Sequence, residues 1–304
     1  MQRVVLISNA NAQTVTPYTR EVIVRALAAG TDLQHVETKR QGHAMHVARG
    51  AAHERVDLVV VLGGDGTMNE VANGLARTDV PMAVLPGGGA NVFARSMGTP
   101  RDPVEATGVL LEKLKTEPRR IPLGLAGGRY FAVNFGVGLD ADIVRAVERR
   151  GLAKKVAGDG FFVWTALRVF FLHTDRRHPR LSVRWGPNLE EGRDALFLAI
   201  GQNLDPYTFL GPRPMRLCPE VTVEGGLDLL ALDRMMAATV LRVALRTFGS
   251  ARHTGAKHVL YLHDEHRIRI ESDGPVPLQV DGEFVGERAS IDVELIPDAL
   301  GVIC

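Results

Sequence analysis

The feature that most constrains the fold is a run of almost entirely apolar residues that ends in glycines. Val56–Leu62 leads directly into Gly63-Gly64-Asp65-Gly66-Thr67, after which the periodicity predicts a helix over Thr67–Ala76. A run without polar alternation is typical of a strand that is covered on both faces. Similar short runs alternate with helical periodicity through the first part of the chain: strands at Val4–Ile7 and Pro81–Leu85, and helices at Thr19–Ala29, His43–Glu54 and Ala90–Met97. This alternation predicts a Rossmann-like α/β domain with a parallel sheet over residues 1–120.

The pattern changes after Pro118 to short apolar runs separated by Gly, Pro or Asp. Strands are expected at Ile121–Ala126, Tyr130–Phe135, Leu181–Trp185, Ala195–Ile200, Leu227–Leu232, His258–Leu262, Arg267–Glu271, Leu278–Val280 and Ala289–Leu295. Many short strands with turn residues between them favour an antiparallel β-sandwich. Residues 121–304 are therefore predicted to form this second domain, with helical insertions at about Asp140–Leu172 and Met235–Phe248.

The glycines after Val56–Leu62 are suited to hold a phosphate group. Glycine lets the backbone approach a ligand closely, and the first amides of a helix attract anions. Ligands of open α/β sheets also bind at the carboxyl ends of the strands, where this turn falls. Asp65 and Thr67 add an acidic group and a hydroxyl that can cap the helix. A tight turn with a helix cap and no ligand would give the same local pattern.

A second turn repeats the design. Leu85-Pro86-Gly87-Gly88-Gly89-Ala90-Asn91 again passes from a strand through glycines into a predicted helix. Two neighbouring strand ends of this kind would make a wider phosphate site than one. The pattern differs from Gly-x-Gly-x-x-Gly, and no Gly-Lys-Ser/Thr is present.

Composition narrows the class of protein. The formal net charge of +1 over 304 residues argues against a nucleic-acid partner, and no apolar stretch reaches the roughly 18–20 residues that a transmembrane helix needs. Only two cysteines occur, which does not favour a disulfide framework. A cytoplasmic protein is expected.

Several motifs together resemble one family. Gly-Gly-Asp-Gly-Thr-Met-Asn-Glu from Gly63 and Leu-Pro-Gly-Gly-Gly-Ala-Asn-Val-Phe-Ala-Arg from Leu85 are similar to the catalytic domain of bacterial diacylglycerol kinases, which are related to sphingosine and ceramide kinases. Asn134–Ala141 and Gln279–Glu283 are similar to two later motifs of that family. The resemblance extends over nearly the whole chain. It implies a nucleotide-binding domain, a β-sandwich domain and an active site in the cleft between them.

The resemblance also implies roles for single residues. ATP is expected at Thr38, Gly63, Gly64, Asp65, Gly66, Thr67, Met68 and Asn69, with Gly88, Gly89, Asn9 and Asn11 as further contacts. Where this chain has Gly89 the family often has Thr, so only the backbone can contribute there. Glu283 is expected to be the catalytic base with Asp281 as its partner, because phosphoryl transfer to an alcohol needs a group that accepts the hydroxyl proton. Asp65 and Asp140 are expected to serve Mg²⁺ or the surrounding polar network.

A structural divalent cation is implied at a later loop. Val221-Thr222-Val223-Glu224-Gly225-Gly226 resembles the family's cation-binding loop, in which one acidic side chain and backbone carbonyls are the ligands. The expected ligands are Glu224 and the carbonyls of Val221 and Gly226. Oxygen ligands suit Mg²⁺ or Ca²⁺. Glu224 replaces the usual Asp, so its oxygens lie further from the backbone.

The expected activity is ATP-dependent phosphorylation of a lipid hydroxyl, with diacylglycerol as the favoured acceptor. An NAD kinase-like enzyme and a weakly catalytic nucleotide- or lipid-binding protein are the alternatives. The apolar segment Phe161–Leu172, with Lys154-Lys155 and Arg176-Arg177 on its flanks, suggests two roles: peripheral contact with a membrane or packing against the sandwich. The sequence indicates neither the lipid nor the oligomeric state, for which a homodimer is one option.

Overall fold

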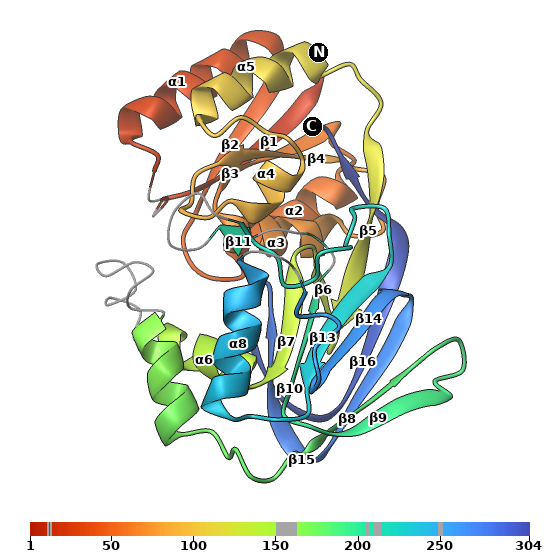
Figure 1. The fold of residues 1–304 in the computed structure, drawn as a ribbon. Helices are drawn as coiled ribbons and strands as arrows, with labels where there is room; N and C mark the ends of the chain where they lie inside the picture. Colours follow the sequence, from red (N-terminus) through yellow and green to blue (C-terminus); the bar gives the residue numbers. More distant parts are fainter. Residues whose placement is uncertain are drawn as a thin grey trace. The chain divides into compact units, whose positions relative to one another are not determined.

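The structure is a computed structural model that describes residues 1–10, 12, 14–149, 163–202, 204, 207–208, 214–248 and 252–304. The chain folds into two compact units (Figure 1). Unit 1 comprises Met1–Leu123 and Ile296–Cys304, and unit 2 comprises Gly124–Leu295. The sequence division at residue 120 left Ile296–Cys304 in the second domain. The structure adds this segment to unit 1, where Val302 pairs with Met82.

Unit 1 is built on a parallel sheet. Its elements are β1 (Arg3–Asn9), α1 (Pro17–Gly30), β2 (Asp32–Thr38), α2 (His43–His53), β3 (Leu58–Gly63), α3 (Asp65–Leu75), β4 (Met82–Pro86), α4 (Val92–Ser96) and α5 (Pro103–Lys113). The strand order is β4-β3-β1-β2, and every pair in this series is parallel. The predicted α/β fold is confirmed for this unit.

Helices cover both faces of this sheet (Figure 1). Ile23 and Leu27 of α1 and Leu110 of α5 belong to one buried cluster with the side chains that β1, β3 and β4 direct to that face. Helices α2 and α3 pack together on the other side. The all-buried pattern of β3 follows from this double cover, since alternate side chains of a strand point to opposite faces.

Unit 2 is rich in antiparallel strands. Its elements are β6 (Arg129–Phe131), β7 (Asn134–Gly138), α6 (Leu139–Glu148), a helix over residues 163–172, β8 (Leu181–Trp185), β9 (Glu191–Leu196), β10 (Leu198–Gln202), β11 (Tyr207–Thr208), β12 (Pro214–Met215), β13 (Leu227–Leu232), α8 (Ala237–Thr247), β14 (Val259–Glu265) and β15 (Arg267–Val280). The strands β5 (Arg119–Ala126) and β16 (Glu283–Val302) continue from one unit into the other along the chain. The predicted antiparallel strand-rich second part is confirmed.

The long strand β15 organises unit 2. Its first half pairs with β8, its last residues pair with β7, and β16 runs along its other edge. Side chains from these strands form one buried core, which includes Phe135, Val183, Ile270 and Leu278. Phe131 and Phe135 pack in this core with ring centroids 5.3 Å apart.

Some predicted elements differ from the observed ones. The expected strand Tyr130–Phe135 is divided into β6 and β7 because Asp281 binds the backbone amides between them. The expected helix Asp140–Leu172 gives α6 and the helix over 163–172, and residues 150–162 lie outside the described part of the chain.

Candidate functional site

Three strand ends of unit 1 meet at the predicted phosphate site. Asn9 at the end of β1 pairs in register with Thr38 at the end of β2. The side-chain amide of Asn9 donates a hydrogen bond of 3.0 Å to the hydroxyl of Thr67 in the first turn of α3. Asn9, Thr38 and Thr67 therefore lie on adjacent elements at the carboxyl edge of the sheet. Asn11 lies outside the described residues.

The two glycine turns touch each other through their backbones. Gly87 N donates a 2.8 Å hydrogen bond to the carbonyl of Gly63. A Cβ atom on Gly88 would lie 2.7 Å from the Cα of Gly64, and one on Gly87 would lie 3.0 Å from the Cα of Gly63. Side chains at these positions would push the turns apart. Glycine is needed here for close approach rather than for a positive φ.

Asp65 fastens the second turn to the first. Its Oδ1 accepts a hydrogen bond of 3.1 Å from the backbone amide of Phe93 in α4. Burial raises the pKa of the Asp65 carboxyl, and the bond from Phe93 together with the nearby Arg95 guanidinium opposes that rise. Asp65 therefore acts at least as a cap for α4, which begins with Asn91 in a left-handed conformation.

The second turn is largely bonded within itself. Gly88 N donates to Oδ1 of Asn91 at 2.9 Å, and Nδ2 of Asn91 donates to Gly88 O at 2.7 Å. Gly88 is half-buried and Gly89 is exposed. The first turn thus offers the better anion site, because the 11-residue helix α3 begins immediately after Gly64.

Met68 and Asn69, which belong to the predicted ATP contacts, lie further along α3 and are buried. Met68 is fully buried, and its amide donates to the carbonyl of Gly64. Asn69 is buried, and its Oδ1 accepts from Nδ2 of Asn73 at 3.1 Å.

Glu70 is a residue that sequence reasoning did not single out. Its two carboxylate oxygens accept hydrogen bonds from Gly42 N at 2.7 Å and Ala44 N at 3.0 Å. Gly42, with a φ of 79°, is the N-cap of α2. Because glycine has no side chain, it cannot cap the helix itself. Glu70 therefore holds the start of α2, and with it the loop that follows Thr38. An acidic residue directly after Gly-Gly-Asp-Gly-Thr-Met-Asn was visible in the sequence, but its partner was not.

The motifs Asn134–Ala141 and Gln279–Glu283 come together in unit 2. Nε2 of Gln279 donates to Oδ2 of Asp140 at 2.7 Å, and Oε1 of Gln279 accepts from Gly282 N at 2.9 Å. Partial burial raises the pKa of the Asp140 carboxyl, while the bond from Gln279 opposes the rise. A Cβ on Gly136 would lie 1.8 Å from Oδ2 of Asp140, so glycine is required beside this carboxyl.

Asp281 is held by backbone amides. Its Oδ1 accepts from Val133 N at 2.9 Å and Asn134 N at 2.8 Å, and its Oδ2 accepts from Ala132 N at 3.0 Å. Its own amide donates to the carbonyl of Asn134, and its φ is 47°. With both oxygens engaged, Asp281 fixes the β15–β16 turn against the start of β7.

Glu283 forms an ion pair with Arg129. The distance from Nη2 of Arg129 to Oε2 of Glu283 is 2.7 Å, and the side chains are 20% and 18% exposed, respectively. Glu283 follows the turn that Asp281 fixes, so the direction of its side chain depends on both contacts.

The loop expected to hold a cation is fixed by hydrogen bonds. Gly226 N donates to Oδ1 of Asp264 at 2.7 Å, and Glu224 is exposed. The neighbouring buried carboxylate of Asp228 accepts from the hydroxyl of Tyr261 and from Nδ1 of His263 at 2.8 Å. Among the described residues, no three His, Cys, Asp or Glu side chains are grouped as metal ligands. The set Val221, Glu224 and Gly226 thus remains a prediction, and the observed contacts of Asp140 belong to the Gln279 network.

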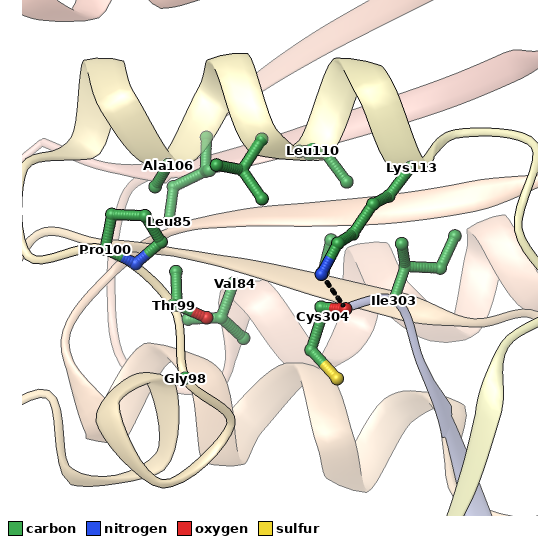
Figure 2. Close-up of a pocket in the computed structure, with 12 residues that line it drawn as sticks. Val84, Leu85, Gly98, Thr99, Pro100, Ala106, Leu110, Lys113, Ile303 and Cys304 are labelled. Carbon is green, nitrogen blue, oxygen red and sulfur yellow. Dashed lines mark hydrogen bonds between the residues drawn. The ribbon is translucent and has the colours of Figure 1, made fainter.

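A small cavity in unit 1 contains none of these candidate residues (Figure 2). It has a volume of about 30 Å³ and lies between β4, α5 and the C-terminal segment. Nζ of Lys113 donates to the carbonyl of Cys304 at 2.7 Å beside it. Its size suits water-sized guests rather than a nucleotide.

Comparisons with known proteins agree with the sequence motifs. Residues 3–125 match the family model of the diacylglycerol kinase catalytic domain. A diacylglycerol kinase of Bacillus subtilis (strain 168) is 27% identical over 271 residues, which cover 88% of this chain and 84% of the relative. A Chromohalobacter salexigens protein named "Probable lipid kinase YegS-like" is 28% identical over 272 residues, which cover 88% of this chain and 82% of the relative.

The fold is shared with solved structures. The crystal structure of a diacylglycerol kinase from Bacillus anthracis str. Sterne aligns with a TM-score of 0.71 at 22% identity, covering 99% of this chain and 96% of that one. The resemblance predicted from the motifs is therefore confirmed: residues 3–125 match the diacylglycerol kinase catalytic domain, and most of the chain is similar to a bacterial diacylglycerol kinase and to a protein named as a probable lipid kinase.

Proposed function

We propose that this protein is an ATP-dependent lipid kinase that transfers the γ-phosphoryl group to a lipid hydroxyl, with diacylglycerol as the favoured acceptor and phosphatidic acid as the product. One observation carries the proposal. The ends of β1, β3 and β4 converge through Asn9, Thr67 and the backbone contacts of Gly63 and Gly87, at the start of an anion-attracting helix. The family match of residues 3–125 covers this same region.

In this proposal the first glycine turn binds the phosphates of ATP. The backbone amides at the start of α3 face a ligand at the end of β3, while Thr38 and Asn9 contact the nucleotide from the neighbouring strands. Met68 is left out of the proposed contacts because it is buried. Asp65 positions the second turn through the amide of Phe93. Mg²⁺ accompanies ATP, and its charge offsets the negative charge of the phosphates.

Glu283 is the proposed base. Its carboxylate accepts the proton of the lipid hydroxyl as the oxygen attacks the γ-phosphorus and the bond to the β–γ bridging oxygen breaks, so that ADP leaves. Arg129 holds the carboxylate in one orientation through the 2.7 Å ion pair. Asp281 acts on the reaction only by fixing the turn that carries Glu283, since its own oxygens are bonded to three backbone amides.

The lipid substrate brings the protein to a membrane surface. No helix in the described residues is long and apolar enough to cross a membrane. Peripheral contact is therefore part of the proposal, and it takes place on the cytoplasmic side, where ATP is found.

A side-by-side kinase assay tests the proposal. Purified protein with γ-labelled ATP and Mg²⁺ is offered dioleoylglycerol in mixed micelles, ceramide, sphingosine and NAD. Labelled phosphatidic acid as the main product is the expected result. Labelled NADP would favour the NAD kinase alternative, and ATP binding without any labelled product would favour a nucleotide-binding protein of low activity.

A further inference from the structure

Two helices of unit 2 gather most of the exposed large apolar side chains among the described residues. Seven of the ten such side chains lie on or next to them, with exposed fractions between 51% and 69%: Trp164, Leu167, Phe171, Leu172, Met236, Leu241 and Leu245. The first four belong to the helix over 163–172, and the others belong to α8 or its N-cap. Such a concentration differs from the scattered single apolar residues of an ordinary surface.

The helix over 163–172 has two distinct apolar faces. Thr165, Val169 and Phe170 point inward, and the latter two are part of a buried cluster of unit 2. Trp164, Leu167 and Phe171 lie on the opposite, exposed face, at the spacing of three and four residues that places side chains on one side of a helix. Packing on the strands therefore accounts for the inner face alone. The sequence left two roles open for this segment: the inner face fits packing against the strands, and the outer face fits contact with a membrane. Phe161 and Phe162 lie outside the described residues.

Helix α8 repeats this arrangement. Val243 points into the same buried cluster as Val169 and Phe170, so both helices are anchored on one part of unit 2 (Figure 1). Leu241 and Leu245 point outward, four residues apart. Arg242 and Arg246 are exposed directly beside them.

The exposed faces are basic as well as apolar. Neither residues 163–172 nor Ala237–Thr247 contain an Asp or Glu. The guanidinium of Arg168 lies 5.6 Å from the ring centroid of Trp164, and that of Arg176 lies 5.4 Å from the ring centroid of Phe171. The nearby carboxylate of Asp175 is already bonded to the Arg177 amide and to His178. Arginine placed over exposed aromatic rings suits the boundary between lipid head groups and acyl chains.

We propose that the helix 163–172 and α8 together form a docking surface for an anionic phospholipid bilayer, called here the helix-pair surface. The apolar side chains enter the upper acyl region, and Arg168, Arg176, Arg242 and Arg246 contact the lipid phosphates. The excess of arginines over acidic residues favours an anionic bilayer over a protein partner of mixed charge. The inference deepens the proposed function, because it states where a lipid kinase would contact the surface that holds its substrate.

Vesicle flotation tests the surface directly. The full chain is incubated with vesicles of phosphatidylcholine alone or with 30 mol% phosphatidylglycerol, at about 50 and 300 mM salt. We expect binding that requires phosphatidylglycerol and weakens at high salt. The variant Leu167→Gln/Phe171→Ser/Leu245→Gln should bind at least tenfold more weakly, as should Arg242→Gln/Arg246→Gln. All these side chains except those of the arginines are more than half exposed, so the fold should be retained, as circular dichroism would show.

The matched control removes exposed apolar side chains from unit 1. Tyr18→Ser and Val104→Gln, at 77% and 42% exposed, should bind vesicles as the unchanged protein does. Equal binding by the triple variant and the unchanged protein would overturn the inference. The inference would also be overturned if the unchanged protein did not bind vesicles but formed a dimer in solution that the triple substitution dissociated. A second copy of the chain would then cover this surface.

A kinase assay separates this inference from the proposed function. With short-chain, monomeric dihexanoylglycerol the triple variant should retain the activity of the unchanged protein, whereas with dioleoylglycerol in anionic vesicles its activity should fall at least tenfold. If neither protein phosphorylates dihexanoylglycerol or dioleoylglycerol, but vesicle flotation shows the expected difference in binding, the kinase proposal fails and the docking surface stands. If both proteins phosphorylate dihexanoylglycerol and vesicle activity is equal, the docking surface fails and the kinase proposal stands.

Discussion

The carboxylate of Asp65 accepts a hydrogen bond of 3.1 Å from the backbone amide of Phe93, across 28 residues of sequence. This contact joins the two glycine turns of unit 1, each of which follows a separate strand of the parallel sheet. The half-buried carboxylate lies where a nucleotide phosphate is proposed to bind, at the start of a helix, which attracts negative charge. Replacing the Asp65 carboxylate by a neutral group is therefore expected to raise the stability of the protein and to lower its activity.

Replacement of Asp65 by Asn should abolish most of the activity, because the charge of a carboxylate expected to serve Mg²⁺ is lost, and it should stabilise the protein at neutral pH. Burial raises the pKa of Asp65 in the folded state above the ordinary value of about 3.9. The native state then holds the proton more tightly than the unfolded state does. The free energy of unfolding therefore falls as the pH rises from the unfolded-state pKa to the folded-state pKa of Asp65, and the loss is complete above the folded-state pKa. Asn keeps an oxygen for the Phe93 amide and has no charge to bury.

Thermal unfolding between pH 4 and pH 8, without ATP or Mg²⁺, checks this prediction. The melting temperature of Asp65→Asn should equal that of the unchanged protein near pH 4 and exceed it at pH 7–8, while kcat falls about a hundredfold or more. The prediction would be contradicted if the melting temperature of the variant, minus that of the unchanged protein, were lower at pH 8 than at pH 4.

Gly88→Ala should weaken nucleotide binding and destabilise unit 1. The new Cβ would lie 2.7 Å from the Cα of Gly64, and the obstacle is backbone that cannot rotate away. Overpacking of this kind costs about 1–3 kcal/mol. Gly108→Ala is the matched control, because its Cβ on α5 meets nothing within 4 Å, and it should stabilise by about 0.5–1 kcal/mol. ATP binding by calorimetry and urea unfolding measure both effects.

Glu70→Ala should loosen the loop that carries Thr38. The substitution leaves the amides of Gly42 and Ala44 without their carboxylate acceptor, at a cost of about 1–3 kcal/mol. KM for ATP should rise several-fold with a smaller change in kcat. Glu21→Ala, which removes an exposed carboxylate paired with Arg25, should change neither quantity measurably.

Asp281→Ala and Asp281→Asn should differ in a way that separates positioning from proton transfer. Alanine releases the amides of Ala132, Val133 and Asn134 and should lower both stability and kcat. Asparagine keeps one acceptor oxygen, which already serves Val133 and Asn134, and should recover much of the activity. Activity equally low in both variants, with an asparagine variant of full stability, would instead favour a chemical role for the carboxylate.

The sequence predicted the local features and missed those that depend on distant residues. The glycine turns at Gly63 and Gly87 could be recognised because a strand, a turn and a helix are consecutive in the chain. Strand β2 was not predicted, since Asp32–Thr38 is an edge strand with an exposed pattern rather than an apolar run. The Asp281 clamp was also not visible, because its amide donors lie 147–149 residues earlier.

The role of the last residues was likewise hidden. The last part of the long strand β16 belongs to unit 1, where it lies beside β4. Tertiary contacts reveal this, among them the pairing of Val302 with Met82 and the hydrogen bond from Arg77 N to the carbonyl of Ala299. The cation predicted at Val221, Glu224 and Gly226 is tested by a measurement of metal content in the purified protein.

The most direct test of the account is the kinetics of Glu283→Gln. This change keeps the size of the side chain and a hydrogen-bond acceptor for Arg129 but removes the group proposed to accept the proton. We predict a kcat lowered by a factor of about 10²–10⁴ with unchanged ATP affinity, whereas Glu287→Gln, an exposed carboxylate on the same strand, keeps full activity. A Glu283→Gln variant that phosphorylates diacylglycerol at the unchanged rate would contradict the proposed mechanism.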